Sequence, residues 1–192
     1  MADMNATTLS AVGISGSPSA RSKSRTLLER ALSELADRGV TTTLLDLAAL
    51  PADALLGRRR TAEVDDALAT ASRSTIIVAS TPVYRATYSG LLKVFFDLLP
   101  LDGLAGKTAI PIATGGSPAH QLVTDHGLRP LFASVGALTI STGIYGTDSA
   151  FENGVPHHSL VARIQAAVSE AITLSERIQV AADSSSSTFV ES

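Results

Sequence analysis

Short apolar segments alternate with amphipathic segments along most of this chain, and this alternation constrains the fold more than any single motif does. Five runs rich in β-branched and aliphatic residues are typical of strands, namely residues 9–14, 40–46, 75–79, 108–113 and 138–142. Apolar residues recur at helical spacing in the intervening and following segments, which cover residues 27–35, 61–73, 91–99, 118–135 and 161–172. Strands that alternate with helices predict a parallel sheet with helices packed on it.

The connections are too short to hold a second domain, so we expect one α/β domain over residues 1–182. Five strands with crossover helices favour a flavodoxin-like, doubly wound parallel sheet in the order 2-1-3-4-5. Pro111 argues against a central position for the fourth strand, because proline lacks the N–H that a ladder needs. Residues 183–192 begin with a serine-rich run and are predicted to form a disordered tail.

Composition excludes several functional classes. The 192 residues include 15 Lys and Arg against 18 Asp and Glu, and a net charge of −3 argues against a dedicated nucleic-acid binder. The chain has no cysteine, which excludes disulfides, iron–sulfur clusters and a cysteine nucleophile. No apolar run approaches the roughly 20 residues of a membrane span, and the N-terminus lacks a secretory pattern, so we expect a cytoplasmic protein that binds neither membrane nor nucleic acid.

The loop after the first predicted strand is rich in serine and basic residues. It runs from Ser15 to Arg25, with Gly16 near its start and Arg21, Lys23 and Arg25 at its end. A helix N-terminus offers free N–H groups and the positive end of a dipole, which suit a phosphate. A solvated helix cap explains the same residues equally well, so both interpretations stay open from this loop alone.

The loops after the third and fourth predicted strands have few bulky side chains. The third, residues 81–90, contains Pro82, which stiffens the backbone of Val83 and Tyr84, although a tight turn with a surface tyrosine is the favoured explanation of this loop taken alone. The fourth, residues 113–117, contains the pair Gly115 and Gly116. Adjacent glycines let a ligand approach the backbone closely, although a tight turn with positive φ is the alternative. Carboxyl ends of parallel strands share one edge, so the three loops together predict a phosphate site beside a slot for a planar ring.

These motifs, in this order and spacing, resemble the NADPH-dependent FMN reductases. The resemblance covers residues 9–154 and rests on Gly-Ser-Pro at 16–18 with Ser22 and Ser24, on Thr-Pro-Val-Tyr-Arg-Ala-Thr-Tyr-Ser-Gly-Leu-Leu-Lys at 81–93, and on Pro-Ile-Ala-Thr-Gly-Gly at 111–116. It is greatest for the flavin reductases that serve alkanesulfonate and methanesulfonate monooxygenases. The resemblance implies a flavodoxin-like fold, FMN at the strand ends, NADPH or alternatively NADH as electron donor, and a homodimer or homotetramer.

The resemblance also implies roles for individual residues. Ser17, Ser22 and Ser24 would hold the FMN phosphate, with Arg25 at a position where relatives carry serine. The other implied cofactor contacts are Pro82, Val83 and Tyr84 beside the ring and ribityl chain, Arg85 toward the NADPH phosphate, and Thr114, Gly115 and Gly116 at the pyrimidine side of the ring.

No catalytic side chain and no metal ligand set is predicted, because hydride transfer from nicotinamide to flavin N5 is chemistry of the cofactors. The resemblance implies that reduced flavin passes to a flavin-dependent monooxygenase. A quinone or azo reductase that retains FMN, and a flavodoxin-like electron carrier, are the alternatives. In the resembling reductases a π-type bulge carries a tyrosine where this chain has His126, followed by Gly127, so we expect either a bulge beside the flavin at a subunit contact or an ordinary helix.

Overall fold

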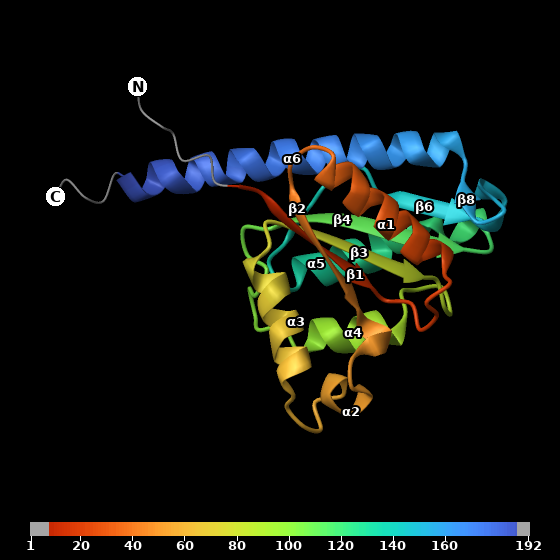
Figure 1. The fold of residues 1–192 in the computed structure, drawn as a ribbon, viewed down its shortest axis with the longest axis horizontal. Helices are drawn as coiled ribbons and strands as arrows, with labels where there is room; N and C mark the ends of the chain where they lie inside the picture. The colour runs from red at the N-terminus through yellow and green to blue at the C-terminus, as the bar shows by residue number, and fades with distance from the viewer. Residues whose placement is uncertain (1–7, 188–192) are drawn as a thin grey trace.

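The computed structural model describes residues 8–187, and they form a parallel sheet between two layers of helices (Figure 1). The sheet order is β2-β1-β3-β4-β5, with β6 also paired to β4, and every pair is parallel. This confirms the predicted flavodoxin-like order. The strands are β1 (Ser10–Ser15), β2 (Thr41–Asp46), β3 (Ile76–Pro82), β4 (Thr108–Gly115), β5 (Leu138–Thr139) and β6 (Ile144–Thr147).

Helices α1 (Lys23–Ala36) and α6 (His158–Ser187) cover one face of the sheet, and α3 (Ala62–Arg73), α4 (Gly90–Asp97) and α5 (Arg129–Ala133) cover the other (Figure 1). Each face has its own apolar core, because strands buried on both sides expose alternate side chains to the two helix layers. The short helices η1 (Leu47–Ala49) and α2 (Ala52–Leu55) lie in the segment before α3.

Pro111 lies in a central strand, so the expectation of a non-central position is wrong. In β4 the amide of Thr108 bonds toward β3, at Thr75, while the carbonyl of Ala109 accepts from Ile140 on the other side. Backbone groups alternate in direction along a parallel strand, so Pro111 turns its nitrogen to the same side as Ala109. The neighbouring strand is interrupted there, between β5 and β6, and no ladder hydrogen bond is lost.

Charged side chains bind the backbone of residues 140–143, the segment between β5 and β6. Arg129 donates to the carbonyls of Ile140 and Ser141, each at 2.6 Å, and Arg163 donates to the carbonyl of Gly143. The Glu170 carboxylate accepts the N–H and hydroxyl of Ser141 at 2.6 Å and the N–H of Thr142 at 3.0 Å. The predicted fifth strand, residues 138–142, is therefore two strands joined by a clamped bend.

The helix predicted over residues 118–135 is divided into three conformations. A 3₁₀ segment, η2 (Pro118–Leu122), precedes the π-helix η3 (Thr124–Leu128), and α5 follows directly. The bulge that the sequence left open is thus present and contains His126 and Gly127. A hairpin of β7 (Phe151–Glu152) and β8 (Val155–Pro156), preceded by η4 (Asp148–Ala150), was not predicted and connects β6 to α6.

Helix α6 extends well past the predicted stripe of residues 161–172 and ends at Ser187. It therefore continues into residues 183–187, which were expected to be disordered, while residues 188–192 lie outside the described part of the chain. The hydroxyl of Ser184 donates to the carbonyls of Val180 and Ala181, so its hydrogen-bonding capacity is met within the helix. Within residues 8–187, no helix combines the length and the apolar character needed to cross a bilayer.

Candidate functional site

Three loops meet at the carboxyl edge of the sheet, on the right-hand side of Figure 1, and hydrogen bonds join them. The Ser89 hydroxyl, which caps α4, donates to the carbonyl of Gly16 and so ties the third loop to the first. The amide of Val83 donates to the carbonyl of Thr114 at 2.8 Å and ties the third loop to the fourth. The predicted convergence of these loops is therefore present in the fold.

The predicted phosphate serines differ in how accessible they are. Ser22 is half-buried and caps α1, since its hydroxyl accepts the Arg25 amide at 3.2 Å and lies 3.3 Å from the Ser24 hydroxyl. Ser24 is fully buried. Ser17 is also buried, and its hydroxyl exchanges hydrogen bonds with the backbone of Ser19. Ser22 is thus the least buried of the three predicted phosphate serines.

Two of the three cations of the first loop are engaged in ion pairs. The Nζ of Lys23 lies 2.7 Å from a carboxylate oxygen of Asp148, which follows β6. Arg25 pairs with Glu29 at 2.8 Å and with Asp46, and the hydrogen bond to Glu29 raises the pKa of its guanidinium. Arg21 is exposed and has no ion pair with any residue in the described range. Arg25 is therefore held toward β2, where it stabilises the loop.

The third loop contains a tight turn in an unusual conformation. Tyr84 and Thr87 exchange backbone hydrogen bonds of 2.9 and 3.1 Å, and Arg85 and Ala86 between them have φ of 51° and 65°. Positive φ at both central residues defines a type I′ turn, which normally selects asparagine and glycine. Pro82 and Val83 are half-buried below it, whereas Tyr84 is 50% exposed and Arg85 is exposed. The turn therefore exposes Tyr84 and Arg85 at a cost in backbone strain.

The paired glycines of the fourth loop are not required by backbone conformation, because neither Gly115 nor Gly116 has a positive φ. The tight-turn alternative is therefore wrong. A Cβ on Gly115 would lie 2.6 Å from the Tyr145 hydroxyl and 3.3 Å from Val83, whereas a Cβ on Gly116 would meet nothing within 4 Å. Gly115 thus serves close packing, and Gly116 leaves open space above the edge of the sheet, beside buried Thr114.

Tyr145 is a site residue that sequence reasoning missed. Its hydroxyl donates to the carbonyl of Ser117 at 2.6 Å, so it supports the glycine loop from β6. Burial, together with the charge of Asp148, raises the pKa of the Tyr145 hydroxyl and keeps it protonated as a donor. The only sequence signal is an aromatic residue in the short run 144–147 after the fifth predicted strand.

The residues present fit a phosphate-bearing planar ligand. Ser15 and Ser80 are neighbours across β1 and β3 below the first loop, and their buried hydroxyls have no hydrogen-bond partner among residues 8–187. Buried hydroxyls without partners are rare and often mark a place for a polar ligand or water. These hydroxyls and the N-terminus of α1 provide hydrogen-bond donors at one end of the carboxyl edge. The open space at Gly116 provides room for a ring at the other end.

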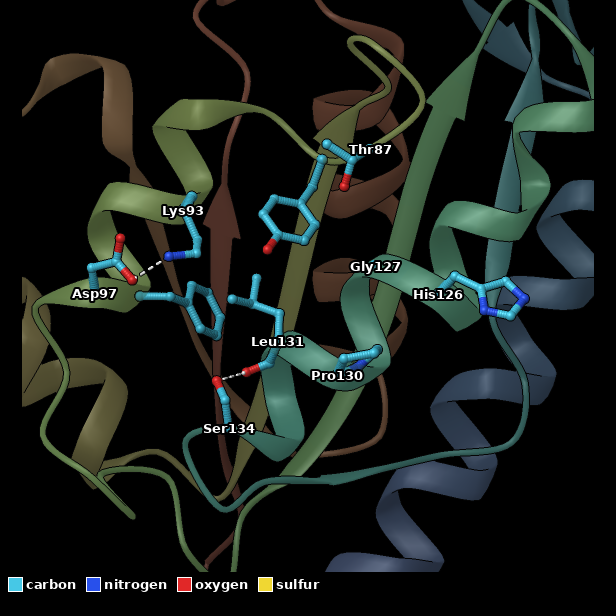
Figure 2. Close-up of a pocket in the computed structure, with 10 residues that line it drawn as sticks. Thr87, Lys93, Asp97, His126, Gly127, Pro130, Leu131 and Ser134 are labelled. Carbon is cyan, nitrogen blue, oxygen red and sulfur yellow. Dashed lines mark hydrogen bonds and ion pairs between the residues drawn. The ribbon is translucent and has the colours of Figure 1, made fainter.

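The π-helix η3 borders a cavity of about 390 Å³ on the face of the sheet that carries α4 (Figure 2). Gly127 faces this cavity and packs against the third loop, since a Cβ there would lie 3.2 Å from the Tyr88 ring. Figure 2 shows the His126 imidazole pointing away from Lys93 and Leu131. The structure therefore connects the bulge to the third loop through Gly127, while His126 is exposed.

Residues 9–152 match the family model described as NADPH-dependent FMN reductase. An FMN reductase (NADPH) of Pseudomonas putida is 40% identical over 80% of this chain and 80% of its own length. The NADH-dependent FMN reductase SfnF of Pseudomonas fluorescens is 36% identical over 86% of this chain and 91% of its own.

Among solved structures, the apo form of an NADH:FMN oxidoreductase has a TM-score of 0.78 and 37% sequence identity, and the match covers 84% of this chain and 87% of that one.

Within residues 8–187, no three side chains of the His, Asp and Glu types gather where they could hold a metal ion.

Proposed function

Because this chain belongs to the NADPH-dependent FMN reductases, we propose that it reduces FMN with NADPH or NADH and supplies the reduced flavin to a partner flavin-dependent monooxygenase. The observation that supports this proposal best is the joined set of loops at the carboxyl edge, with donors at the first loop and open space at Gly116. The relatives named for NADPH and for NADH leave the electron donor open between the two.

The binding roles follow from the positions of the loops. Ser22 and the first turn of α1 would donate to the FMN phosphate, with Ser17 and Ser24 holding the loop in shape. Pro82, Val83 and Tyr84 would border the ring from the third loop, and Thr114, Gly115 and Gly116 would line its opposite edge. Arg85, exposed on the strained turn, would meet the phosphate of the nicotinamide nucleotide.

FMN, when bound, supplies the redox chemistry by accepting a hydride from the nicotinamide. The protein's part is to orient two flat rings and to exclude water, so no general acid or base is needed. The Tyr145 hydroxyl and the Val83 amide donate to the carbonyls of Ser117 and Thr114 and so hold the backbone of the glycine loop in place. Backbone N–H dipoles fixed in this way would stabilise negative charge that develops on a ligand.

The partner is inferred from the relatives' class and from the exposed character of the site. The named relatives include NADH-dependent FMN reductases called SfnF and SfnE. The resemblance to reductases of sulfonate monooxygenase systems supports delivery of reduced flavin rather than retention. A homodimer or homotetramer belongs to the same proposal, with the exposed residue His126 of η3 at a subunit contact beside the flavin.

Steady-state oxidation of NADPH and of NADH in the absence of oxygen, with FMN in large excess over purified protein, tests the function. We expect many turnovers per protein molecule with FMN alone. An electron carrier would stop after one equivalent, and a reductase that retains FMN would turn over only after a quinone or azo acceptor is added. Either result would contradict the proposal.

A further inference from the structure

An ion pair crosses the carboxyl edge above the candidate phosphate site. Lys23 is the first residue of α1, which follows β1, and Asp148 directly follows β6. Strands β3 and β4 lie between β1 and β6 in the sheet, so this pair spans the ends of both. The Nζ of Lys23 also lies 5.6 Å from the centre of the Phe151 ring, in the hairpin after Asp148.

The stability of α1 does not explain why Lys23 stands there. The first turn of a helix is the positive end of its dipole and favours acidic residues, yet the first turn of α1 has Lys23 and Arg25 and no acid. The ion pair itself is solvated, since the side chains of Lys23 and Asp148 are 40% and 74% exposed, and such pairs contribute little to folding. The arrangement instead suits an anion at the helix end.

Asp148 supplies negative charge to this cationic end from outside α1. Its carboxylate engages Lys23, while Arg25 is held by Glu29 and Asp46 and Arg21 points to solvent. The buried hydroxyls of Ser15 and Ser80, which have no partner in the described part of the chain, lie below the same loop and favour a polar ligand there independently of the charges. A dianionic phosphate at this loop would therefore compete with Asp148 for Lys23.

We propose that Asp148 is a positioning residue that lowers the affinity of this protein for the phosphate of FMN, because its carboxylate holds Lys23 across the site. This inference rests on the proposed function. A phosphate bound at Ser22 draws Lys23 away from Asp148, and the return of Lys23 to Asp148 favours release of the flavin. The effect is specific to the phosphate, so riboflavin does not experience it.

Titration of flavin fluorescence with the purified apoprotein tests the proposal. Asp148→Asn keeps the shape of the side chain and removes its charge, and it should tighten FMN binding by about fivefold, the scale of one exposed ion pair. Riboflavin should bind the native protein and the variant equally. In a Lys23→Met background, Asp148→Asn should have little further effect, because the cation that it releases is gone.

Asp65→Asn is the matched control, because it breaks the exposed Arg60–Asp65 pair and changes the net charge equally, away from the three loops. Unchanged FMN affinity in Asp148→Asn would overturn the proposal. So would equal tightening of FMN and riboflavin, equal tightening in the Lys23→Met background, or the same gain in Asp65→Asn. Failure of the native protein to bind or turn over FMN would instead overturn the proposed function.

Discussion

The two glycines of the fourth loop differ in whether packing within the protein requires them. Gly115 is needed by the protein itself, since a Cβ there would contact the Tyr145 hydroxyl at 2.6 Å. Gly116 is not, because a Cβ there meets no atom within 4 Å in the described part of the chain beyond its own neighbours, and its φ is not positive. The sequence does not distinguish these adjacent glycines, but the structure shows that close packing explains only Gly115.

Gly116 gives a direct test of the ring slot. Gly116→Ala and Gly116→Val should retain the native circular dichroism spectrum and melting temperature, because the added atoms point into open space. FMN affinity should fall progressively, by about tenfold or more for valine, as the larger side chain enters the slot. Flavin titration checks this, and native affinity in the valine variant would show that the ring lies elsewhere.

Strain in the third loop can be measured at Ala86, whose φ is 65°. Left-handed conformation costs an L-residue about 1–2 kcal/mol, and glycine avoids that cost. Ala86→Gly should therefore increase the free energy of unfolding by about 1 kcal/mol in urea titration. Ala69→Gly, within helix α3, is the matched control and should decrease it by a similar amount. A decrease in both variants would show that the turn is unstrained.

At the scale of elements, the sequence predicted most of what local pattern determines. Strands β1 to β4 and helices α1, α3 and α4 lie within a few residues of their predicted ranges, because their apolar periodicity matches their burial. The split of the fifth strand was not predictable, because it depends on Arg129, Arg163 and Glu170 from distant helices. The effect of Pro111 was not predictable either, because it depends on the neighbouring strand. Since that strand is interrupted between β5 and β6, the missing N–H of Pro111 costs no ladder hydrogen bond.

At the candidate site, too, local sequence pattern predicted the positions of the loops but not the contacts between distant segments. The three loops were predictable because parallel strands place their carboxyl ends together. The hydroxyl ties from Ser89 and Tyr145, the buried state of Ser24, and the pairing of Lys23 with Asp148 depend on contacts between segments far apart in sequence. The same holds for Arg25, whose partner Asp46 is at the end of β2.

The clamp at Glu170 predicts an acid-sensitive element. Burial alone would raise the pKa of the Glu170 carboxyl, but hydrogen bonds from Ser141 and Thr142 outweigh it and lower the pKa to about 2. A carboxyl with a folded pKa below its ordinary 4.5 adds stability that is complete above pH 4.5 and is lost as the pH falls toward 2. Glu170→Gln should therefore be less stable than the native protein by about 1–2 kcal/mol at pH 7.

That difference should shrink as the pH falls from 4.5 toward 2, because the native carboxyl then becomes protonated and loses its advantage over the amide. Urea unfolding of both proteins across this range checks the prediction. A stability difference that is constant with pH would show that the carboxylate charge does not hold the bend between β5 and β6.

At the scale of the whole molecule, the two cores share one sheet, so the three loops belong to one cooperative unit. Strands β1, β3 and β4 contribute to both the α1–α6 core and the α3–α4–α5 core. A ligand that bridges the ends of these strands therefore stabilises the domain against global unfolding rather than one loop alone. The phosphate loop and the ring slot should respond together in a single thermal transition.

Ser22 provides the means to measure that response. Ser22→Asn and Ser22→Asp both retain a side chain that caps α1, and they differ by one negative charge at the place proposed for the phosphate. FMN at about 100 times its dissociation constant should stabilise the native protein by about 2.7 kcal/mol in a single transition. At that FMN concentration Ser22→Asn should keep most of the gain in melting temperature and Ser22→Asp should lose most of it, while the two variants respond alike to riboflavin. Equal gains with FMN in both variants would place the phosphate away from the N-terminus of α1.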